Sequence, residues 1–330
     1  MFSFTDWFGF FPSSQPPSRI NLRETERFGT NPGGLRMFTY VPEKLAAGAP
    51  LVVVLHGALQ SAGDYAHGSG WLTLAERFGF AVLFPEQSRT NNAFRCFHWY
   101  RRRDTERGQG EGRSIWQMIE RTTAHHQIDR RSVFITGLSA GGAMTNAMLA
   151  AYPEVFAAGA VIAGLPFGAA SNLQEALNCM APGFARAGSD WGDRVRAASS
   201  NTGSWPRISV WHGDADDTVH ALNADETVKQ WINVHGLTDD PTVTEHLDGC
   251  VREAWHDRSG GPQIERYAIP HMLHGTPVGP DSGGAPCGQR GAYFLDVGLS
   301  SSWLIAQFWG LVDECTSTSR VSGVMLERAR

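Results

Sequence analysis

The sequence has few cysteines and contains no long hydrophobic run. Its 330 residues include five cysteines, at positions 96, 179, 250, 287 and 315, and no two of them form a Cys-x-x-Cys motif. This absence argues against a zinc knuckle and a thioredoxin-like redox motif. At most two disulfides could form, and their pairing is open. No apolar run reaches about 18 residues, so no membrane span is predicted.

Charge is also scarce, and neither sign dominates. Charged residues make up 18% of the chain, and 28 basic against 33 acidic residues give a net charge of −5. Nucleic-acid binding needs a strongly basic surface, so this balance argues against a nucleic-acid partner. The basic run at 101–103 is followed by Asp104 and Glu106 and is typical of a solvated face. Hydrophobic residues reach 42%, enough for a large core.

The first residues are apolar but unlike an export signal. Residues 1–18 read MFSFTDWFGFFPSSQPPS, with no basic start and no small-x-small cleavage site. We interpret them as part of an N-terminal arm. The localisation stays open, because a cytoplasmic protein and a protein secreted after processing both fit the sequence.

Buried strands and helices alternate along the chain. Apolar runs predict strands at 36–41, 51–55, 80–84, 133–136, 158–163, 208–211 and 264–269. Helical spacing predicts helices at 71–78, 114–125, 143–152, 224–234 and 300–311. We expect Pro85 to end its strand, residues 87–110 to form a long loop and residues 166–206 to form an insertion. Such alternation is typical of the α/β class, with a mostly parallel central sheet and helices on both faces.

The chemistry of such sheets lies outside the carboxyl ends of the strands. Gly137-Leu-Ser139-Ala-Gly141 is a Gly-x-Ser-x-Gly motif placed between a predicted strand and a predicted helix, as in a nucleophile elbow. Ser139 would adopt a strained backbone, and side chains at 137 and 141 would collide, so both positions need glycine. The alternative is a purely structural role, in which the motif is a glycine-rich turn and the serine caps the following helix.

Two backbone amides are predicted to form an oxyanion hole. His56-Gly57-Ala58 ends the strand at 51–55, and Ala140 follows Ser139. In a nucleophile elbow these two places supply the N–H donors, which predicts the amides of Ala58 and Ala140. The alternative is that His56-Gly57 simply permits a tight turn.

Candidates for the acid and the base follow later strands. Asp214, Asp216 and Asp217 crowd one loop, and we favour Asp216 as the acid, with the other two as turn formers or caps. His274 is favoured over His271 as the base. No further ligand stands at matching spacing for zinc, so no metal or cofactor is predicted. The order Ser139, Asp216, His274 is that of α/β-hydrolases.

At these residues the chain resembles the short-chain polyhydroxyalkanoate (PHB) depolymerase family of α/β-hydrolase esterases, which is related to feruloyl and acetylxylan esterases. The resemblance rests on LHGxxQ at 55–60, HGSGW at 67–71, GLSAGGAM at 137–144, WHGDADDTV at 211–219 and HGTPV at 274–278. Further similar blocks carry it from about residue 34 to 312. It implies a catalytic domain over 34–312, with 166–206 shaping the cleft, an arm over 1–33 and a tail over 313–330.

The resemblance assigns the nucleophile to Ser139, the acid to Asp216, the base to His274 and the oxyanion amides to residues 58 and 140. It has two departures. Family members commonly have cysteine where this chain has Ala58, which puts a disulfide to Cys96 in doubt, and asparagine where it has His98.

The predicted function is a serine carboxylic-ester hydrolase that acts through an acyl-enzyme on short-chain (hydroxy)acyl esters. Gln60, Trp71 and Trp99 are candidates for substrate contacts, since aromatic walls suit an apolar acyl or aryl group, although core packing explains most of the tryptophans equally well. The expected partner is a small-molecule or oligomeric ester, and the oligomeric state is open. The alternatives are a feruloyl or acetylxylan-type esterase and, in a different class, a non-catalytic hydrolase-like binding protein.

Overall fold

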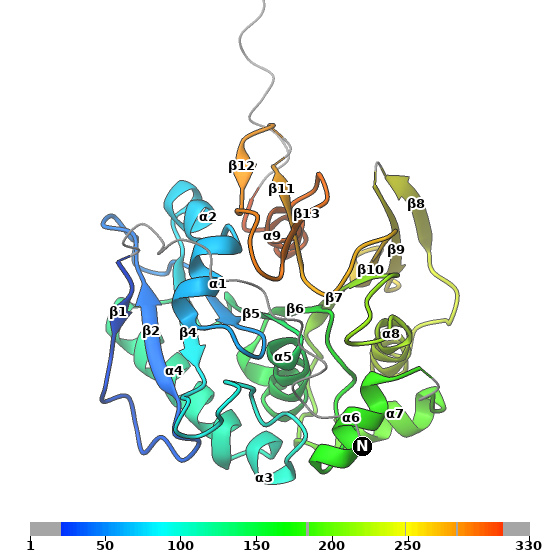
Figure 1. Cartoon of the computed structure of the whole chain (residues 1–330), viewed down its shortest axis with the longest axis horizontal. Coiled ribbons are helices and arrows are strands. Elements are labelled where there is room, and N and C mark those ends of the chain that lie inside the picture. Colours follow the sequence, from blue (N-terminus) through cyan, green and yellow to red (C-terminus); the bar gives the residue numbers. More distant parts are fainter. Residues whose placement is uncertain (1–20, 183–184, 248, 282, 313–330) are drawn as a thin grey trace, which may run out of the picture.

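The computed structural model describes residues 21–182, 185–247, 249–281 and 283–312. Its centre is a ten-stranded sheet in the spatial order β1-β2-β4-β3-β5-β6-β7-β10-β9-β8 (Figure 1). The strands are β1 (Arg23–Glu24), β2 (Arg36–Tyr40), β3 (Leu51–Leu55), β4 (Ala81–Glu86), β5 (Val133–Leu138), β6 (Ala158–Ile162), β7 (Arg207–Gly213), β8 (Val243–Leu247), β9 (Cys250–His256) and β10 (Pro262–Ile269).

The middle of the sheet is parallel and its two edges are antiparallel. Strands β4, β3, β5, β6, β7 and β10 pair in parallel. Antiparallel pairing joins β1 to β2 and β2 to β4 at one edge, and β10 to β9 and β9 to β8 at the other. The middle strands β3, β5 and β6 are buried at every residue, which is why their sequences are apolar without alternation.

Helices cover both faces of the sheet, as predicted. They are α1 (Ala62–Gly68), α2 (Trp71–Phe78), α3 (Arg102–Thr105), α4 (Gly110–His126), α5 (Ala140–Ala151), a 3₁₀ turn (Pro153–Val155), α6 (Leu173–Met180), α7 (Gly188–Ala197), α8 (Leu222–His235) and α9 (Ser301–Trp309). Side chains of α4, α5 and α8 belong to one hydrophobic core cluster, and those of α1, α2 and α9 belong to a second. Each cluster also takes alternate side chains of β3, so the two cores lie on opposite faces of the sheet.

A small second sheet follows the main one along the chain. Its strands β11 (Thr276–Pro280), β12 (Pro286–Cys287) and β13 (Phe294–Asp296) have the spatial order β12-β11-β13. Figure 1 shows this sheet standing out from the domain beside α9. It was not predicted, because its strands are short and rich in proline and glycine, which are turn signals in a sequence.

The structure also departs from the sequence prediction elsewhere. The prediction that Pro85 ends its strand is wrong, because β4 continues to Glu86 and Pro85 faces Met37 of β2. Pro85 lies beyond the part of β4 that pairs with β3, so its missing N–H breaks no hydrogen bond of that ladder. The antiparallel β8–β9 pair and helix α1 were not predicted. Strand β8 is largely exposed, so it lacks the apolar signal of the middle strands.

Part of the predicted N-terminal arm packs on the sheet. Strand β1 pairs with β2, and the amides of Asn31 and Gly33 donate to side chains of α4 at 2.9 and 2.8 Å. Residues 1–20 and the predicted tail at 313–330 lie outside the described residues. Of the helices in the described ranges, none is long and apolar enough to cross a membrane.

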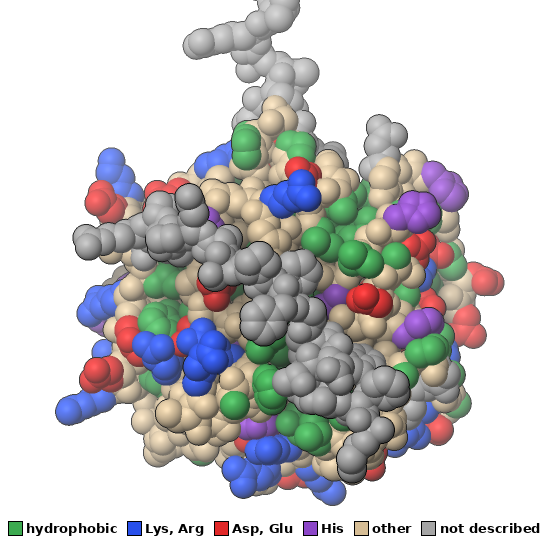
Figure 2. Space-filling view, viewed as in Figure 1, with side chains coloured by type: hydrophobic (Ala, Val, Ile, Leu, Met, Phe, Trp, Pro, Cys, Tyr) green, Lys and Arg blue, Asp and Glu red, His purple; other side chains and the backbone are tan. Residues whose placement is uncertain are grey.

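The surface on the side shown in Figure 2 carries charges of both signs. Acidic and basic side chains are interspersed around its rim, and hydrophobic side chains gather nearer its middle. Beneath the surface, Cys96, Cys179, Cys250 and Cys287 are buried and free, while Cys315 lies outside the described residues. Cys96 therefore forms no disulfide here, in agreement with the alanine at position 58.

Candidate active site

Ser139 lies in a strained turn between β5 and α5. Its φ of 56° and ψ of −117° lie in a region that non-glycine residues rarely adopt. The amide of Ser139 donates to the carbonyl of Ile162 in β6 at 2.8 Å, which ties the turn to the neighbouring strand. Surrounding structure therefore holds a backbone conformation that costs energy, a feature that concentrates at functional sites.

The two glycines of the motif are required by close packing. A Cβ atom added to Gly137 would lie 2.5 Å from the carbonyl carbon of Gly141. A Cβ atom on Gly141 would clash with the carbonyl oxygens of Leu55 and His56 at the end of β3. The elbow and the loop after β3 are thus in direct backbone contact, and no side chain fits between them.

Ser139 opens into a small apolar cavity of about 30 Å³. We call it the serine cavity; it is lined by Ala58, Cys96, Trp99, Tyr100, Ser139, Ala140, Leu165, Leu173, Ala176, Leu177, Met180 and Val219. The described residues provide no acceptor for the amide of Ala58. Ala140 is the first residue of α5, where an amide has no partner within the helix. Both predicted oxyanion amides therefore belong to residues that line the same cavity as Ser139.

His274 lines a pocket together with Ser139 and is held by Asp216. Both Ser139 and His274 line a second small pocket, together with Gly57, Ala58, Gln60, Leu138 and Tyr293. The Nδ1 atom of His274 is 2.7 Å from the Oδ2 atom of Asp216. A carboxylate only accepts, so Nδ1 donates to Asp216, and in the neutral imidazole Nε2 is then the nitrogen that can accept a proton. Asp216 comes from the loop after β7 and His274 from the loop after β10, neighbouring parallel strands.

The carboxylate of Asp216 is fully hydrogen-bonded. Its Oδ1 atom accepts from the amides of Thr218 and Val219 at 2.9 and 2.8 Å. Its Oδ2 atom accepts from His274 and is also 3.1 Å from Nε2 of His212. Burial alone would raise the pKa of this carboxyl, but the hydrogen bonds from His212 and His274 outweigh burial and hold the pKa well below its usual range. Asp216 therefore stays ionised beside His274.

His212 is a contributor that sequence reasoning missed. It lies in β7, and its Nε2 atom is 2.7 Å from the carbonyl oxygen of Val219 as well as 3.1 Å from Asp216. Because a carbonyl oxygen only accepts, Nε2 of His212 carries a proton that both oxygens share. The signal in the sequence was a histidine at the end of a strand, four residues before the favoured acid. Twelve histidines in the chain made that signal too weak.

The competing candidates have other partners. Asp214 accepts from the amide of His271 at 2.6 Å and so joins the loops after β7 and β10. Asp217 accepts from the hydroxyl of Thr218 at 3.3 Å. His271 is exposed, whereas His274 is buried. The structure thus brings Asp216 and His274 together and leaves Asp214, Asp217 and His271 outside this pair.

The three predicted substrate-contact residues have different environments. Trp99 is 9% exposed and lines the serine cavity. Gln60 lines the neighbouring pocket, but its Oε1 atom accepts from the amide of Gly57 at 2.8 Å, which braces the loop after β3. Trp71 does not line either pocket; it is 1% exposed and stacks on Trp309 at 5.4 Å between ring centroids. The predicted substrate contact of Trp71 is corrected: this residue packs in the core beneath α2 and α9.

His98, the departure noted beside Trp99, is part of a buried polar network. Its Nδ1 atom is 2.6 Å from Oε1 of Glu111, and its amide donates to the other oxygen of Glu111 at 2.8 Å. Asn92 approaches Nε2 of His98 at 3.1 Å. Gln87 also donates to Glu111, at 2.6 Å. This network fixes the loop that carries Trp99, because all four side chains lie on that loop or on the helix beneath it.

The described residues form no cluster of three or more histidine, cysteine or acidic side chains that could hold a metal ion. The groups that the site offers are a hydroxyl in a strained turn, an imidazole oriented by a carboxylate, and amides beside an apolar cavity.

The chain is similar to proteins that cleave esters. The family model described as Esterase PHB depolymerase matches residues 36–255. Poly(3-hydroxyalkanoate) depolymerase C of Paucimonas lemoignei is 45% identical over 292 residues, which cover 88% of this chain and 70% of that protein. Feruloyl esterase B of Thermothelomyces thermophilus is 33% identical over 256 residues, covering 75% of this chain and 86% of that one.

A solved structure supports the same relationship. The structure of an acetyl xylan esterase from Aspergillus awamori superposes with a TM-score of 0.76 at 26% sequence identity. The match covers 88% of this chain and 100% of that one.

Proposed function

The chain belongs to the Esterase PHB depolymerase family and is a carboxylic-ester hydrolase of the α/β-hydrolase fold, and we propose that it works as a serine esterase through Ser139, Asp216 and His274. The observation that carries this proposal is the 2.7 Å contact between Asp216 and His274, with His274 lining one pocket with Ser139. The strained backbone of Ser139 supports it independently.

The proposed reaction has two halves. Nε2 of His274 takes the proton of Ser139 while the hydroxyl oxygen attacks the ester carbonyl, and Asp216 stabilises the imidazolium that forms. The amides of Ala58 and Ala140 donate to the oxyanion of the tetrahedral intermediate. His274 then delivers its proton to the leaving alcohol, which leaves an acyl group on Ser139. Water, activated by His274, attacks that acyl-enzyme and releases the acid.

The proposed substrates are short-chain hydroxyacyl esters such as oligomers of 3-hydroxybutyrate. The serine cavity of about 30 Å³ favours a short acyl group, because it has room for only a few heavy atoms. The relative named as a poly(3-hydroxyalkanoate) depolymerase is 45% identical, against 33% for the feruloyl esterase. Under this proposal the insertion at 166–206 shapes the cleft, since Leu173 and Met180 of α6 line the serine cavity.

A feruloyl or acetylxylan-type activity is the second candidate, and relatives with those names support it. A panel of esters with the purified protein separates the two. We expect kcat/KM for 3-hydroxybutyrate oligomers and p-nitrophenyl butyrate to exceed that for methyl ferulate and acetylated xylan by at least about tenfold. Preference for methyl ferulate or acetylated xylan would overturn the substrate proposal and leave the esterase assignment in place. A protein that cleaves none of these esters would contradict the serine-esterase proposal and favour a binding role.

A further inference from the structure

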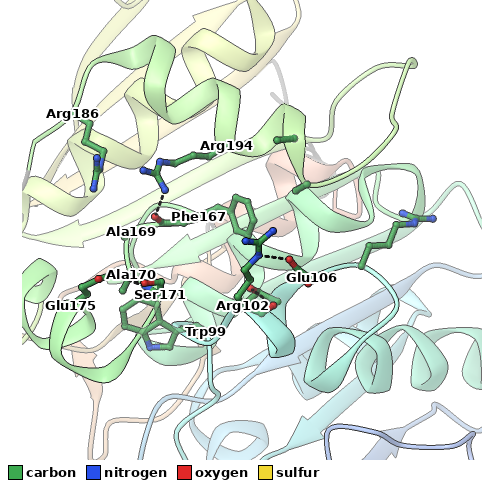
Figure 3. Close-up of a pocket in the computed structure, with 15 residues that line it drawn as sticks. Trp99, Arg102, Glu106, Phe167, Ala169, Ala170, Ser171, Glu175, Arg186 and Arg194 are labelled. Atoms are coloured by element: carbon green, nitrogen blue, oxygen red, sulfur yellow. Dashed lines mark hydrogen bonds and ion pairs between the residues drawn. The ribbon is translucent and has the colours of Figure 1, made fainter.

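A larger cavity lies beside the serine cavity and has a different lining. Its volume is about 660 Å³, within the range that small-molecule ligands occupy. Figure 3 shows the side chains around it, which come from the loop before α3, from α3, from the segment before α6 and from α7. We call it the arginine cavity; it is lined by Trp99, Arg102, Thr105, Glu106, Arg107, Phe167, Gly168, Ala169, Ala170, Ser171, Glu175, Arg186, Arg194, Ala197 and Ala198.

Trp99 connects the two cavities. Its side chain lines the serine cavity and the arginine cavity, so it forms the wall between them. A second segment also passes from one cavity to the other. Leu165 lines the serine cavity and Phe167 lines the arginine cavity, with one residue between them in the sequence. The two cavities are therefore adjacent, and an ester that occupied both would pass Trp99.

The arginine cavity carries more positive than negative charge. Four arginines and two glutamates line it. Both glutamates have partners close by: Glu106 pairs with Arg102, and Glu175 accepts from the amide of Ser171 at 2.8 Å. Arg107 also pairs outside the cavity, with Glu154 at 2.6 Å. Arg102 and Arg107 are thus offset by Glu106 and Glu154, and the remaining lining has Arg186 and Arg194 against Glu175, which leaves the balance positive.

Arg194 carries the excess charge. Its Nη1 atom donates to the carbonyl oxygen of Gly168 at 3.1 Å, at the wall of the cavity (Figure 3). Within the described ranges no carboxylate lies within the 4.0 Å that defines an ion pair with Arg194. Arg194 is exposed at the cavity, so a ligand can reach its guanidinium. Burial and Arg186 lower its pKa, while Asp190 and Glu175 act in the opposite direction. The guanidinium also lies over the ring of Trp191, 5.9 Å from its centroid, which fixes its direction.

A carboxylate is the group that this arrangement suits. A guanidinium offers five N–H donors in a planar fork that matches the two oxygens of a carboxylate. Apolar neighbours such as Phe167 and Ala170 suit the short aliphatic chain that would lead to it. Because the serine cavity has room only for a short acyl group, the alcohol part of the ester is the part left for the larger cavity.

We propose that the arginine cavity binds a free carboxylate carried on the alcohol part of the ester, with Arg194 as its main partner. This inference rests on the proposed function of Ser139. Such a carboxylate site makes the enzyme selective for oligoesters that end in a free acid. From these oligoesters the enzyme releases the terminal hydroxy acid. In the dimer of 3-hydroxybutyrate, water adds across the one ester bond and two hydroxy acids are released.

The test compares that dimer as the free acid with its methyl ester, which keeps the internal ester bond but has no negative charge. Only cleavage of the internal bond is counted, which for the methyl ester releases 3-hydroxybutyrate and methyl 3-hydroxybutyrate; methanol release is measured separately. We expect the native protein to show a kcat/KM ratio of acid to methyl ester of at least about ten, since hydrogen bonds to a charged group are worth roughly that much. Arg194→Met should bring the ratio close to about one, and Arg194→Lys should retain part of the preference because it keeps the charge.

Arg196→Met is the matched control. Arg196 lies on the same helix, but its guanidinium contacts Asp193 and Asn233 and does not line the cavity. This variant should keep the ratio of the native protein. The ratio is measured within each variant, so a partly unfolded sample does not change it. If Arg194→Met yields no folded protein, Arg194→Lys and competition by the acid and its methyl ester against p-nitrophenyl butyrate in the native protein decide the question.

The outcomes separate the two proposals. Equal kcat/KM for acid and methyl ester in the native protein, or an unchanged ratio in Arg194→Met, overturns the carboxylate site while the esterase remains. An equal loss of preference in Arg196→Met also overturns it, because general charge would then be the cause. No cleavage of either dimer or of p-nitrophenyl butyrate contradicts the proposed function itself.

Discussion

The two cavities on either side of Trp99 differ in size, lining and charge. The serine cavity has a volume of about 30 Å³ and no charged side chain in its lining. The arginine cavity has about 660 Å³ and six charged side chains around it. The smaller cavity is lined by the elbow that carries Ser139, by the loops that follow β3, β4, β6 and β7, and by one face of α6. Most of the larger cavity comes from α3, α7 and the segment before α6.

This difference separates chemistry from selectivity. The strands of the central sheet hold Ser139, Asp216 and His274 in place, and a dry, apolar cavity strengthens the electrostatic interactions of such groups. Side chains on connecting segments are free to vary in charge and length without disturbing the sheet. Substitutions of the catalytic groups at the smaller cavity should therefore lower activity on every ester. Substitutions at the larger cavity should lower activity on only some esters.

The largest expected effect is loss of the nucleophile. Ser139→Ala should lower kcat by about 10⁶-fold on every ester, as in other serine hydrolases that lose this group. The methyl side chain fits the same turn, so the melting temperature should stay near that of the native protein. Steady-state kinetics on p-nitrophenyl butyrate and on the hydroxybutyrate dimer measure the effect. A variant that retains even a tenth of native turnover on either ester would refute the role of Ser139.

An intermediate effect is expected from His212, which contacts Asp216 and so acts on the reaction only through Asp216 and His274. His212→Ala removes one of the hydrogen bonds to the carboxylate and should lower kcat about 10- to 100-fold with little change in KM. His212→Gln keeps a donor at that place and should recover part of the loss. His235→Gln changes a half-buried histidine whose partner is the carbonyl of Pro206; it is the control and should keep native kcat. Equal losses of kcat in His212→Ala and His212→Gln would show that the hydrogen bond to Asp216 does not account for the effect of His212.

The smallest effect is expected from opening the wall between the cavities. Trp99→Leu should raise the ratio of kcat/KM for p-nitrophenyl octanoate over p-nitrophenyl acetate by about tenfold, because a longer acyl chain gains room. Trp116→Leu removes another tryptophan, stacked on Tyr152 away from both cavities, and should leave the ratio unchanged. The account of Trp99 as a wall fails if the ratio does not move, or if it moves equally in both variants.

Much of the central sheet could be predicted from sequence because burial on both faces leaves a clear signal. Runs such as Leu51–Leu55 and Val133–Leu138 are apolar at nearly every position, and the structure buries each of them completely. The edges gave weaker signals. Strand β8 is exposed and polar, and Pro85 is a strand-ending signal in the sequence, whereas in the structure it pairs with Met37 of the antiparallel strand β2.

The sequence before helix α1 contains a capping signal that predicts the start of a helix. Helix α1 begins after Ser61, whose side chain accepts from the amide of Asp64 while Asp64 accepts from the amide of Ser61. Such a reciprocal cap is visible in sequence as a serine followed three residues later by an acidic residue. The glycines around it obscured the helical pattern.

For the site, sequence could nominate groups that follow strands but not their partners in space. It singled out Asp216 among three aspartates, and the structure brings Asp216 to His274. It could not find His212, because the contact between His212 and Asp216 depends on how the loop folds back on β7. Trp71 failed as a substrate contact for a similar reason: only packing on Trp309 shows which face of its helix is buried.

The most direct test of the central claim is covalent labelling of the active serine. The native protein is incubated with a fluorophosphonate, and the adduct is located by mass spectrometry of its peptides. The account predicts one adduct per chain, on Ser139, formed in step with the loss of esterase activity, and none in Ser139→Ala. An adduct on another residue that abolishes activity, or full activity with Ser139 labelled, would contradict it.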